Sequence, residues 1–224
     1  MKIETLFIDL DDTLYDRSNG LWEAIRGRMS RYMHECVGLP EQEVPQIRRH
    51  YFETYGTTLR GLQIHHHVDA DEYLTYVHDL PIREYVSPDP QLKILLAEIS
   101  QPKWILTNAS SEHAQRVLDT LGVAESFSGI IDIRAMDFHC KPEPEAYQIA
   151  MKIASQSDPT RCLYLDDSPL NLTTAKAMGM TTILIGNVPS SPSADLVIPH
   201  IHDLKEAFPE LWNHCKGNSE KIDG

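Results

Sequence analysis

Two aspartates, Asp9 and Asp11, follow the apolar run Leu6–Ile8 with a single leucine between them. Asp12 and Thr13 come next, so several carboxyl groups and a hydroxyl lie where a predicted buried strand ends. Crowded carboxylates repel one another and are better solvated in water, so stability alone does not explain them. A divalent cation would explain them, because hard cations take oxygen ligands. With a cation bound, one carboxylate could attack an electrophile while its neighbour carries a proton; the plainer alternative is a solvated acidic turn.

Three further polar groups follow predicted strands later in the chain. They are Thr107–Asn108, Lys141 before a Pro-Glu-Pro sequence, and Asp166–Asp167. In an open parallel sheet, ligands bind outside the carboxyl ends of the strands, so these groups could meet at one edge. Taken singly, each has an ordinary interpretation: a helix-capping turn, a solvated loop lysine and a plain strand exit. Their occurrence together with the first acidic group favours a shared site.

Strand-like and helix-like segments alternate from about residue 90 onward. Short apolar runs predict strands, and apolar residues at helical spacing predict helices. The predicted strands are 103–107, 130–133, 162–165, 182–185 and 195–198, and the predicted helices are 90–100, 111–121, 145–155 and 170–178. Such alternation is typical of parallel strands joined by crossover helices. We therefore predict an α/β fold with a doubly wound, mostly parallel sheet.

The segment 16–88 breaks this alternation. It shows helical spacing from Leu21 to Cys36 and again in 41–55 and 71–79, without a convincing strand. This pattern indicates a helical insertion rather than part of the sheet. The predicted parts are a catalytic core of residues 1–15 and 89–215, a small all-helical cap of residues 16–88 inserted after the first strand, and a disordered tail of residues 216–224.

Size and charge narrow the class of partner. The chain has 224 residues, 42% of them hydrophobic, which suits one ordinary domain plus a smaller one. No apolar stretch approaches a membrane span, the start lacks an apolar targeting core, and scattered cysteines indicate reduced thiols, so we expect a cytoplasmic protein. The net charge of −13 argues against a nucleic-acid polymer or an anionic membrane as partner. A small phosphate could still bind if the site supplies positive charge.

The four polar groups, taken in order, resemble a known set of motifs. They read Asp-Leu-Asp-Asp-Thr at 9–13, Thr-Asn at 107–108, Cys-Lys-Pro-Glu-Pro at 140–144 and Leu-Asp-Asp-Ser at 165–168. This order resembles the motifs of the haloacid dehalogenase superfamily, in its phosphatase branch, over essentially the whole core. The insertion lies where helical caps of that superfamily lie, and the segments 9–16, 55–62 and 76–79 resemble the pyrimidine 5′-nucleotidase subfamily. The resemblance implies a Rossmann-like core and a Mg²⁺-dependent phosphatase.

The resemblance implies two catalytic aspartates. Asp9 would attack phosphorus and become an aspartyl phosphate. Asp11 would protonate the departing alkoxide and then deprotonate the water that hydrolyses the intermediate. Crowding by other carboxylates is expected to favour a proton on Asp11. An aspartate at this second position distinguishes phosphoryl transfer from dehalogenation within the resemblance.

The resemblance also implies the groups that hold metal and phosphate. Mg²⁺ would be held by the Asp9 carboxylate, the main-chain carbonyl of Asp11 and Asp167, with Asp166 in support through water. Some relatives have glutamate-aspartate in place of Asp166–Asp167, which leaves the direct ligand of the two open. The residues that would hold the phosphoryl oxygens are Thr107, Asn108 and Lys141. Lys141 and the metal would supply the positive charge that the acidic surface lacks.

Two cap residues are candidates for contact with the leaving group. Arg60 could steer an anionic substrate, as against a plain surface role. Tyr55 could stack on a base, as against ordinary packing. The run His65-His66-His67 resembles a metal cluster, but consecutive histidines point in different directions on a helix, so we expect a solvated or substrate-facing segment.

The favoured function is therefore a pyrimidine 5′-nucleotidase that converts UMP or CMP to nucleoside and phosphate, as a monomer or small homo-oligomer. A sugar-phosphate phosphatase of the same fold is the alternative, since the fold does not fix the substrate. A signalling receiver domain also phosphorylates an aspartate beside a metal, but it is shorter and has its motifs in another order. A non-catalytic scaffold is disfavoured because every catalytic position is present.

Overall fold

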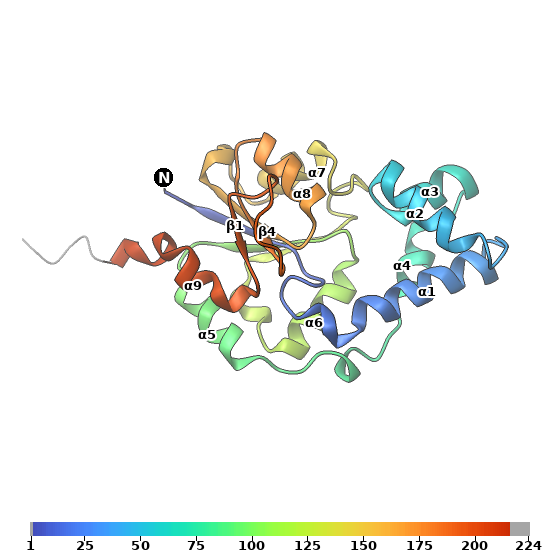
Figure 1. Cartoon of the computed structure of the whole chain (residues 1–224), viewed down its shortest axis with the longest axis horizontal. Coiled ribbons are helices and arrows are strands. Elements are labelled where there is room, and N and C mark those ends of the chain that lie inside the picture. The colour runs from blue at the N-terminus through green and yellow to red at the C-terminus, as the bar shows by residue number, and fades with distance from the viewer. Residues whose placement is uncertain (1, 216–224) are drawn as a thin grey trace, which may run out of the picture.

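A parallel sheet forms the centre of the molecule in a computed structural model that describes residues 2–215 (Figure 1). Its strands are β1 (Thr5–Ile8), β2 (Lys103–Leu106), β3 (Gly129–Ile131), β4 (Cys162–Asp166), β5 (Thr181–Ile185) and β6 (Leu196–Ile198). They lie in the order β3-β2-β1-β4-β5-β6, and every neighbouring pair is parallel. The chain builds one side of the sheet from β1 and then the other from β4, so the strand order reverses between them. Ligand sites of open sheets lie at such a switch point.

The two central strands are buried along their whole length, as parallel strands covered on both faces are. Their register pairs Ile8 with Leu165. Asp9, just after β1, and Asp166, the last residue of β4, therefore lie side by side. This register is what brings the first and fourth polar groups together.

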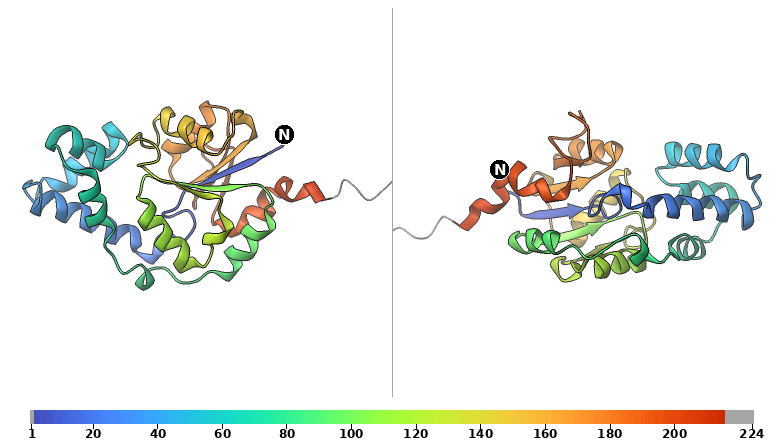
Figure 2. Two further views of the ribbon diagram at one scale, coloured as in Figure 1. Left: turned by 180° about the vertical axis from the view of Figure 1, so that it is seen from behind. Right: turned by 60° about the horizontal axis from the view of Figure 1, so that its bottom comes forward.

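Helices cover both faces of the sheet (Figure 2). They are α5 (Pro90–Glu98), α6 (Ser111–Leu121), α7 (Pro144–Ile153), α8 (Pro169–Ala177) and the short α9 (Leu204–Ala207). Leu6 and Ile8 join the apolar cluster that contains α5 and α6, whereas Phe7 joins the cluster of α7 and α8. Alternate residues of β1 thus bury opposite faces, as the strand period requires. The predicted α/β fold is confirmed.

The insertion after β1 is helical, as predicted, and lies beside the sheet in both figures. It contains α1 (Leu21–Glu35), α2 (Val44–Tyr55), α3 (Thr58–His66) and α4 (Ala70–His78). These helices share an apolar cluster of their own, which includes Met33, Leu62 and Val77. The start of α1 and the segment after α4 instead join the core through Leu21 and Ile82.

The division at residues 16 and 88 stays a prediction, and the predicted tail of 216–224 lies outside the described residues. Within residues 2–215, no helix has the length and apolar character needed to cross a membrane.

The packing of the cap can be tested with two helical glycines. A Cβ at Gly61 in α3 would lie 2.2 Å from Cγ of Tyr51 in α2, whereas a Cβ at Gly27 in α1 meets nothing within 4 Å. We expect Gly61→Ala to lower the free energy of unfolding by about 1–3 kcal/mol through overpacking. Gly27→Ala should raise it by about 0.5–1 kcal/mol through helix propensity. Urea unfolding measures both, and equal effects would contradict the packing of α3 on α2.

Candidate active site

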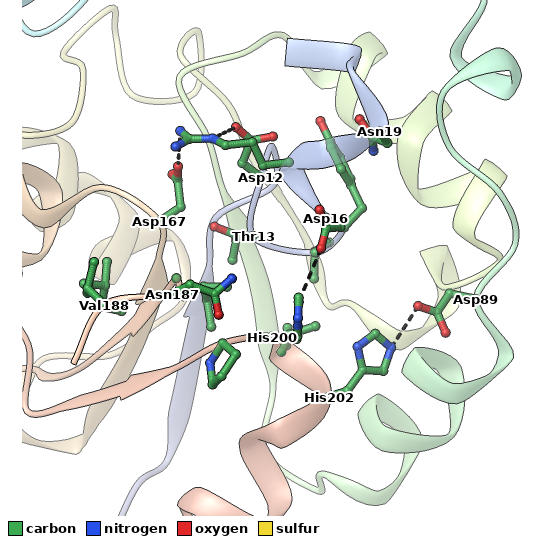
Figure 3. A pocket seen from close by; sticks show the side chains of 18 of the residues that line it. Asp12, Thr13, Asp16, Asn19, Asp89, Asp167, Asn187, Val188, His200 and His202 are labelled. Atoms are coloured by element: carbon green, nitrogen blue, oxygen red, sulfur yellow. Dashed lines mark hydrogen bonds and ion pairs between the residues drawn. The ribbon is translucent and has the colours of Figure 1, made fainter. Parts of the chain in front are cut away.

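A cavity of about 760 Å³ opens at the carboxyl edge of the sheet, beside the loop that follows β1 (Figure 3). Its lining includes Asp12, Thr13 and Arg17 of that loop and Asp167 after β4. Arg17 bridges the two carboxylates, with Nε donating to Asp12 Oδ2 at 2.8 Å and Nη2 donating to Asp167 Oδ2 at 3.1 Å. The guanidinium therefore offsets negative charge at one end of the cavity.

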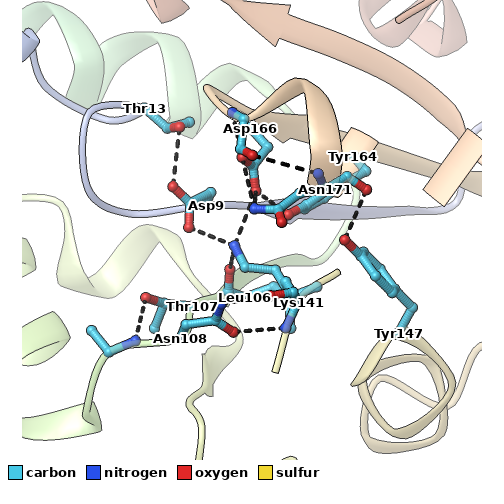
Figure 4. A network of polar contacts seen from close by, with 12 residues as sticks. Asp9, Thr13, Leu106, Thr107, Asn108, Lys141, Tyr147, Tyr164, Asp166 and Asn171 are labelled. Atoms are coloured by element: carbon cyan, nitrogen blue, oxygen red, sulfur yellow. Dashed lines mark hydrogen bonds and ion pairs between the residues drawn. The ribbon is translucent and has the colours of Figure 1, made fainter. Parts of the chain in front are cut away.

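Lys141 links residues at the carboxyl ends of β1, β2 and β4 through hydrogen bonds of its ammonium group (Figure 4). It is 2% exposed, and its Nζ donates to Asp9 Oδ1 at 2.6 Å and to Asp166 Oδ2 at 3.0 Å. The third bond, of 2.7 Å, goes to the carbonyl of Leu106 at the end of β2. Burial would lower the pKa of Lys141, but the carboxylates of Asp166 and Asp9 outweigh it and raise that pKa. The structure thus brings Asp9, Lys141 and Asp166 together around one ammonium, which also binds the carbonyl at the end of β2.

Asp9 is held in a defined orientation. Its main-chain N–H donates to the Leu165 carbonyl at 2.9 Å, and its Oδ2 accepts from the Thr13 hydroxyl at 3.2 Å. Burial raises the pKa of Asp9 well above its usual range, against the opposing effect of Lys141, and the carboxylates of Asp166 and Asp167 add to the rise. The side chain is a buried carboxylate whose charge is balanced mainly by one lysine.

The adjacent carboxylates Asp166 and Asp167 differ in their surroundings. Asp166 is fully buried, and its oxygens accept from the main chain of Ser168, from the Asn171 amide, from the Tyr164 hydroxyl and from Lys141. Asp167 has a side chain that is 22% exposed and pairs with Arg17. Burial raises the pKa of Asp167 to about 7, and the carboxylates of Asp166 and Asp12 add to the rise.

A cation could be held among these carboxylates. Asp9, Asp166 and Asp167 each offer an oxygen, and these oxygens lie within 4.8 Å of one another. The donors are hard oxygens, which suit Mg²⁺ or Ca²⁺ better than softer metals. Within residues 2–215, Asp166 accepts from four protein residues, whereas each oxygen of Asp9 accepts from one and Asp167 accepts from Arg17 alone, so Asp9 and Asp167 have more free lone pairs for a cation.

Asn108 contacts the lysine loop rather than an open space. Its Nδ2 donates to the Lys141 carbonyl at 2.9 Å, and its Oδ1 accepts from the Lys141 main-chain N–H at 2.8 Å. Thr107 is buried, and its hydroxyl accepts from the N–H of Ala109 at 3.0 Å. The sequence placed both residues among phosphate ligands, and that role stays a prediction. In the structure, Asn108 fixes the loop that carries the lysine.

Asp11 is not part of the cluster of three carboxylates and has partners of its own. Its Oδ1 accepts from the Tyr15 hydroxyl at 2.5 Å and from His113 Nε2 at 2.9 Å. Burial would raise the pKa of Asp11, but His113 and Tyr15 outweigh it and lower that pKa. The expectation that crowded carboxylates favour a proton on Asp11 is wrong, because its neighbours are donors rather than other acids.

His113 is a site residue that the sequence reasoning missed. It lies in the first turn of α6, and a lone histidine at the start of a helix gives no signal of its own in the sequence. Its ring stacks on that of His78, with centroids 4.3 Å apart and planes 17° from parallel. The Ser110 hydroxyl accepts from the His113 N–H at 3.3 Å and bonds to His78 Nδ1 at 3.2 Å. Burial, with His113 beside it, lowers the pKa of His78 to about 3.

The cap candidates Tyr55 and Arg60 line a second cavity of about 460 Å³. Pro142 and Leu170, which follow the third and fourth polar groups, line it from the core side. The Tyr55 hydroxyl bonds to His65 Nε2 at 2.7 Å. The turn between α2 and α3 therefore lies against the loop that carries Lys141, and contact of Tyr55 and Arg60 with a leaving group stays a prediction.

The histidine run is engaged with tyrosines. His66 Nε2 bonds to the Tyr51 hydroxyl at 2.8 Å, and His65 stacks on the Tyr51 ring at a centroid distance of 5.2 Å. None of the potential metal-binding groups among the described residues includes these histidines. His65 and His66 thus pack against tyrosines of the cap, and the expected solvated or substrate-facing role of the run stays a prediction.

Comparison with known proteins gives one family and several relatives. Residues 3–179 match the family model of the haloacid dehalogenase-like hydrolases. Phosphate metabolism protein 8 of Saccharomyces cerevisiae is 28% identical over 195 residues, which are 81% of this chain. The chain spans 61% of the length of that relative.

Solved structures share the fold at low sequence identity. β-Phosphoglucomutase from Clostridium difficile matches with a TM-score of 0.61 at 19% identity, over 94% of this chain and 97% of its own. L-2-haloacid dehalogenase from Xanthobacter autotrophicus matches with a TM-score of 0.59 at 16% identity, over 91% and 97%. At such identities the likeness concerns the fold alone, so the chemistry rests on the residues of this chain.

The buried His78 predicts a pH dependence of stability. Its pKa falls from 6.5 to about 3 on folding, so between these values the unfolded chain binds more protons than the folded one. The free energy of unfolding should therefore fall as pH drops, by about 2 kcal/mol from this group between pH 6.5 and pH 5. His78→Gln should lose less stability over that range, as measured by urea unfolding at each pH. Parallel pH profiles for the two proteins would contradict a neutral buried His78.

Proposed function

Because the chain belongs to the haloacid dehalogenase-like hydrolases, we propose that it is a Mg²⁺-dependent phosphatase of small phosphomonoesters. The observation that supports this most is the buried Lys141 between Asp9 and Asp166 at the switch point of the sheet. A cation there offsets charge on a carboxylate and on phosphoryl oxygens next to it. The preferred substrate that we propose is a pyrimidine nucleoside monophosphate, UMP or CMP.

In the first step, a carboxylate oxygen of Asp9 forms a bond to phosphorus while the ester P–O bond breaks. The departing alkoxide takes a proton from Asp11. The pKa of Asp11 is lowered in the protein without substrate. A bound phosphate dianion would raise the pKa of Asp11 through like-charge repulsion. In the second step, water attacks phosphorus, Asp11 takes its proton, and the Asp9 carboxylate is released with inorganic phosphate.

Lys141 and Asn108 prepare the site for this sequence. Lys141 holds Asp9 Oδ1, so the nucleophile is oriented before substrate arrives. Asn108 holds the main chain of Lys141 through both of its amide atoms. Thr107 completes the phosphate-binding set that we propose.

Asp9, Asp167 and the main-chain carbonyl of Asp11 would hold Mg²⁺. Asp166 would support them, since its oxygens already accept from several protein donors. When bound, the metal supplies positive charge beside the phosphoryl oxygens. Arg17 pairs with Asp167 in this structure, and the bound metal would take the place of the guanidinium beside that carboxylate.

The cap supports a nucleotide as substrate. Tyr55 and Arg60 both line the second cavity; Tyr55 offers an aromatic face and Arg60 a cation. An aromatic ring can stack on a base, and a guanidinium can bind a carbonyl or phosphate oxygen. Phosphate release should be measured for UMP, CMP, AMP, GMP, sugar phosphates and an aryl phosphate. Preference for sugar phosphates would replace the nucleotidase assignment with the alternative, and no release from any would overturn the proposed function.

Asp9→Asn tests the nucleophile. We expect kcat to fall by about three orders of magnitude or more, since the amide cannot form the aspartyl phosphate. Circular dichroism should show an intact fold, because the two side chains have nearly the same volume. Turnover close to that of the unchanged protein would remove Asp9 from its role.

Metal binding can be measured apart from activity. Mg²⁺ should raise the thermal unfolding midpoint of the unchanged protein in a concentration-dependent way. Asp167→Asn should lose most of this shift, because it removes a proposed ligand. EDTA should abolish phosphate release, and added Mg²⁺ should restore it. A full thermal shift in Asp167→Asn would exclude Asp167 as a ligand.

A further inference from the structure

We infer that His113 is a positioning residue for Asp11, acting with Tyr15, and that His78 of the cap holds the His113 ring. The inference rests on the proposed role of Asp11 as acid and base. His113 itself touches neither the clustered carboxylates nor Lys141 in the contacts given above. It would act only through the orientation of the Asp11 carboxyl group.

Both donors bind the same oxygen of Asp11. Tyr15 and His113 approach Oδ1 at 2.5 Å and 2.9 Å, while Oδ2 has no hydrogen-bond partner within residues 2–215. Rotation of the carboxyl group would break both bonds at once. One oxygen is therefore fixed, and the other keeps a constant direction in which it can give or take a proton. Such orientation matters because general acids act at hydrogen-bond distance from the reacting atom.

Stability does not account for a histidine at position 113. The side chain is fully buried, and its Nδ1 has no partner among the described residues. An unpaired buried polar atom is unfavourable, and an apolar side chain of similar size would avoid that cost. The bond to Asp11 is a contact that an apolar side chain could not supply here. This favours selection of the histidine for what it does to Asp11.

The ring of His113 is fixed from the cap side. His78, at the end of α4, stacks on it with ring centroids 4.3 Å apart. The Ser110 hydroxyl bonds both to His78 Nδ1 and to the main-chain N–H of His113. Arg116, which lies in α6 with His113, donates to the His78 carbonyl at 3.0 Å. The buried imidazole of His113 therefore contacts both the end of the cap, through His78, and the carboxyl group of Asp11.

The test uses His113→Leu and His113→Gln in the full chain, with two substrates. One is the nucleoside monophosphate, whose alkoxide needs a proton to leave; the other is p-nitrophenyl phosphate, whose phenolate leaves without one. We expect His113→Leu to lower kcat on the nucleotide by roughly 10–100-fold with KM changed less than about threefold. His113→Gln, which keeps an N–H donor, should recover part of this loss.

Rapid-mixing measurements separate positioning from general damage. On p-nitrophenyl phosphate, His113→Leu should give a fast burst of nitrophenol followed by slow turnover, because hydrolysis of the aspartyl phosphate still needs Asp11. His34→Gln is the control, since His34 Nδ1 also makes a hydrogen bond of 2.9 Å, with the Leu39 carbonyl, and His34 lines neither cavity. The control should behave like the unchanged protein on both substrates.

Equal losses on both substrates without a burst, or no loss on either, would overturn the inference. If His113→Leu does not fold, Tyr15→Phe removes the other donor to Oδ1, and unchanged leaving-group dependence in that variant would also overturn it. Failure of the unchanged protein to hydrolyse any phosphomonoester would instead overturn the proposed function. The two failures are therefore distinguishable.

Discussion

A buried ammonium between two buried carboxylates is the interaction on which the rest of the site depends. Lys141 contacts Asp9 and Asp166 where water is nearly excluded. Removing such charges from water costs several kcal/mol for each ion, and their attraction often only repays that cost. A core built for stability alone would place apolar side chains there. The arrangement is understandable when the charges are needed to orient a nucleophile.

The sheet makes that arrangement possible. The strand order reverses between β1 and β4, and their register sets Asp9 beside Asp166. The loop that carries Lys141 is anchored on the exit of β2 through Asn108 and the Leu106 carbonyl. Apolar strands thus supply rigidity, while the residues just beyond their ends supply the chemistry. A dehalogenase and a mutase share this fold with the chain, so its particular reaction must lie in these residues and in the cap.

The two proposed catalytic aspartates have opposite surroundings although one residue separates them. Asp9 lies among carboxylates with one lysine, and burial raises its pKa. Asp11 lies between a phenol and an imidazole, and these donors lower its pKa despite burial. Side chains on either side of one leucine point in different directions as the chain leaves β1. That divergence gives the proposed nucleophile and the proposed proton carrier separate environments.

Local patterns in the sequence were enough to predict the α/β fold, the helical insertion and the order of the polar groups, because residue periodicity and strand exits are local properties. They also favoured Asp9, Lys141 and the Asp166–Asp167 pair as site residues. Only the tertiary structure decided what each side chain contacts: that His113 binds Asp11, that Arg17 pairs with Asp167, and that Asp166 is occupied by protein donors. These contacts join residues up to 150 positions apart. Their geometry follows from strand register and helix packing, which no short stretch of sequence encodes.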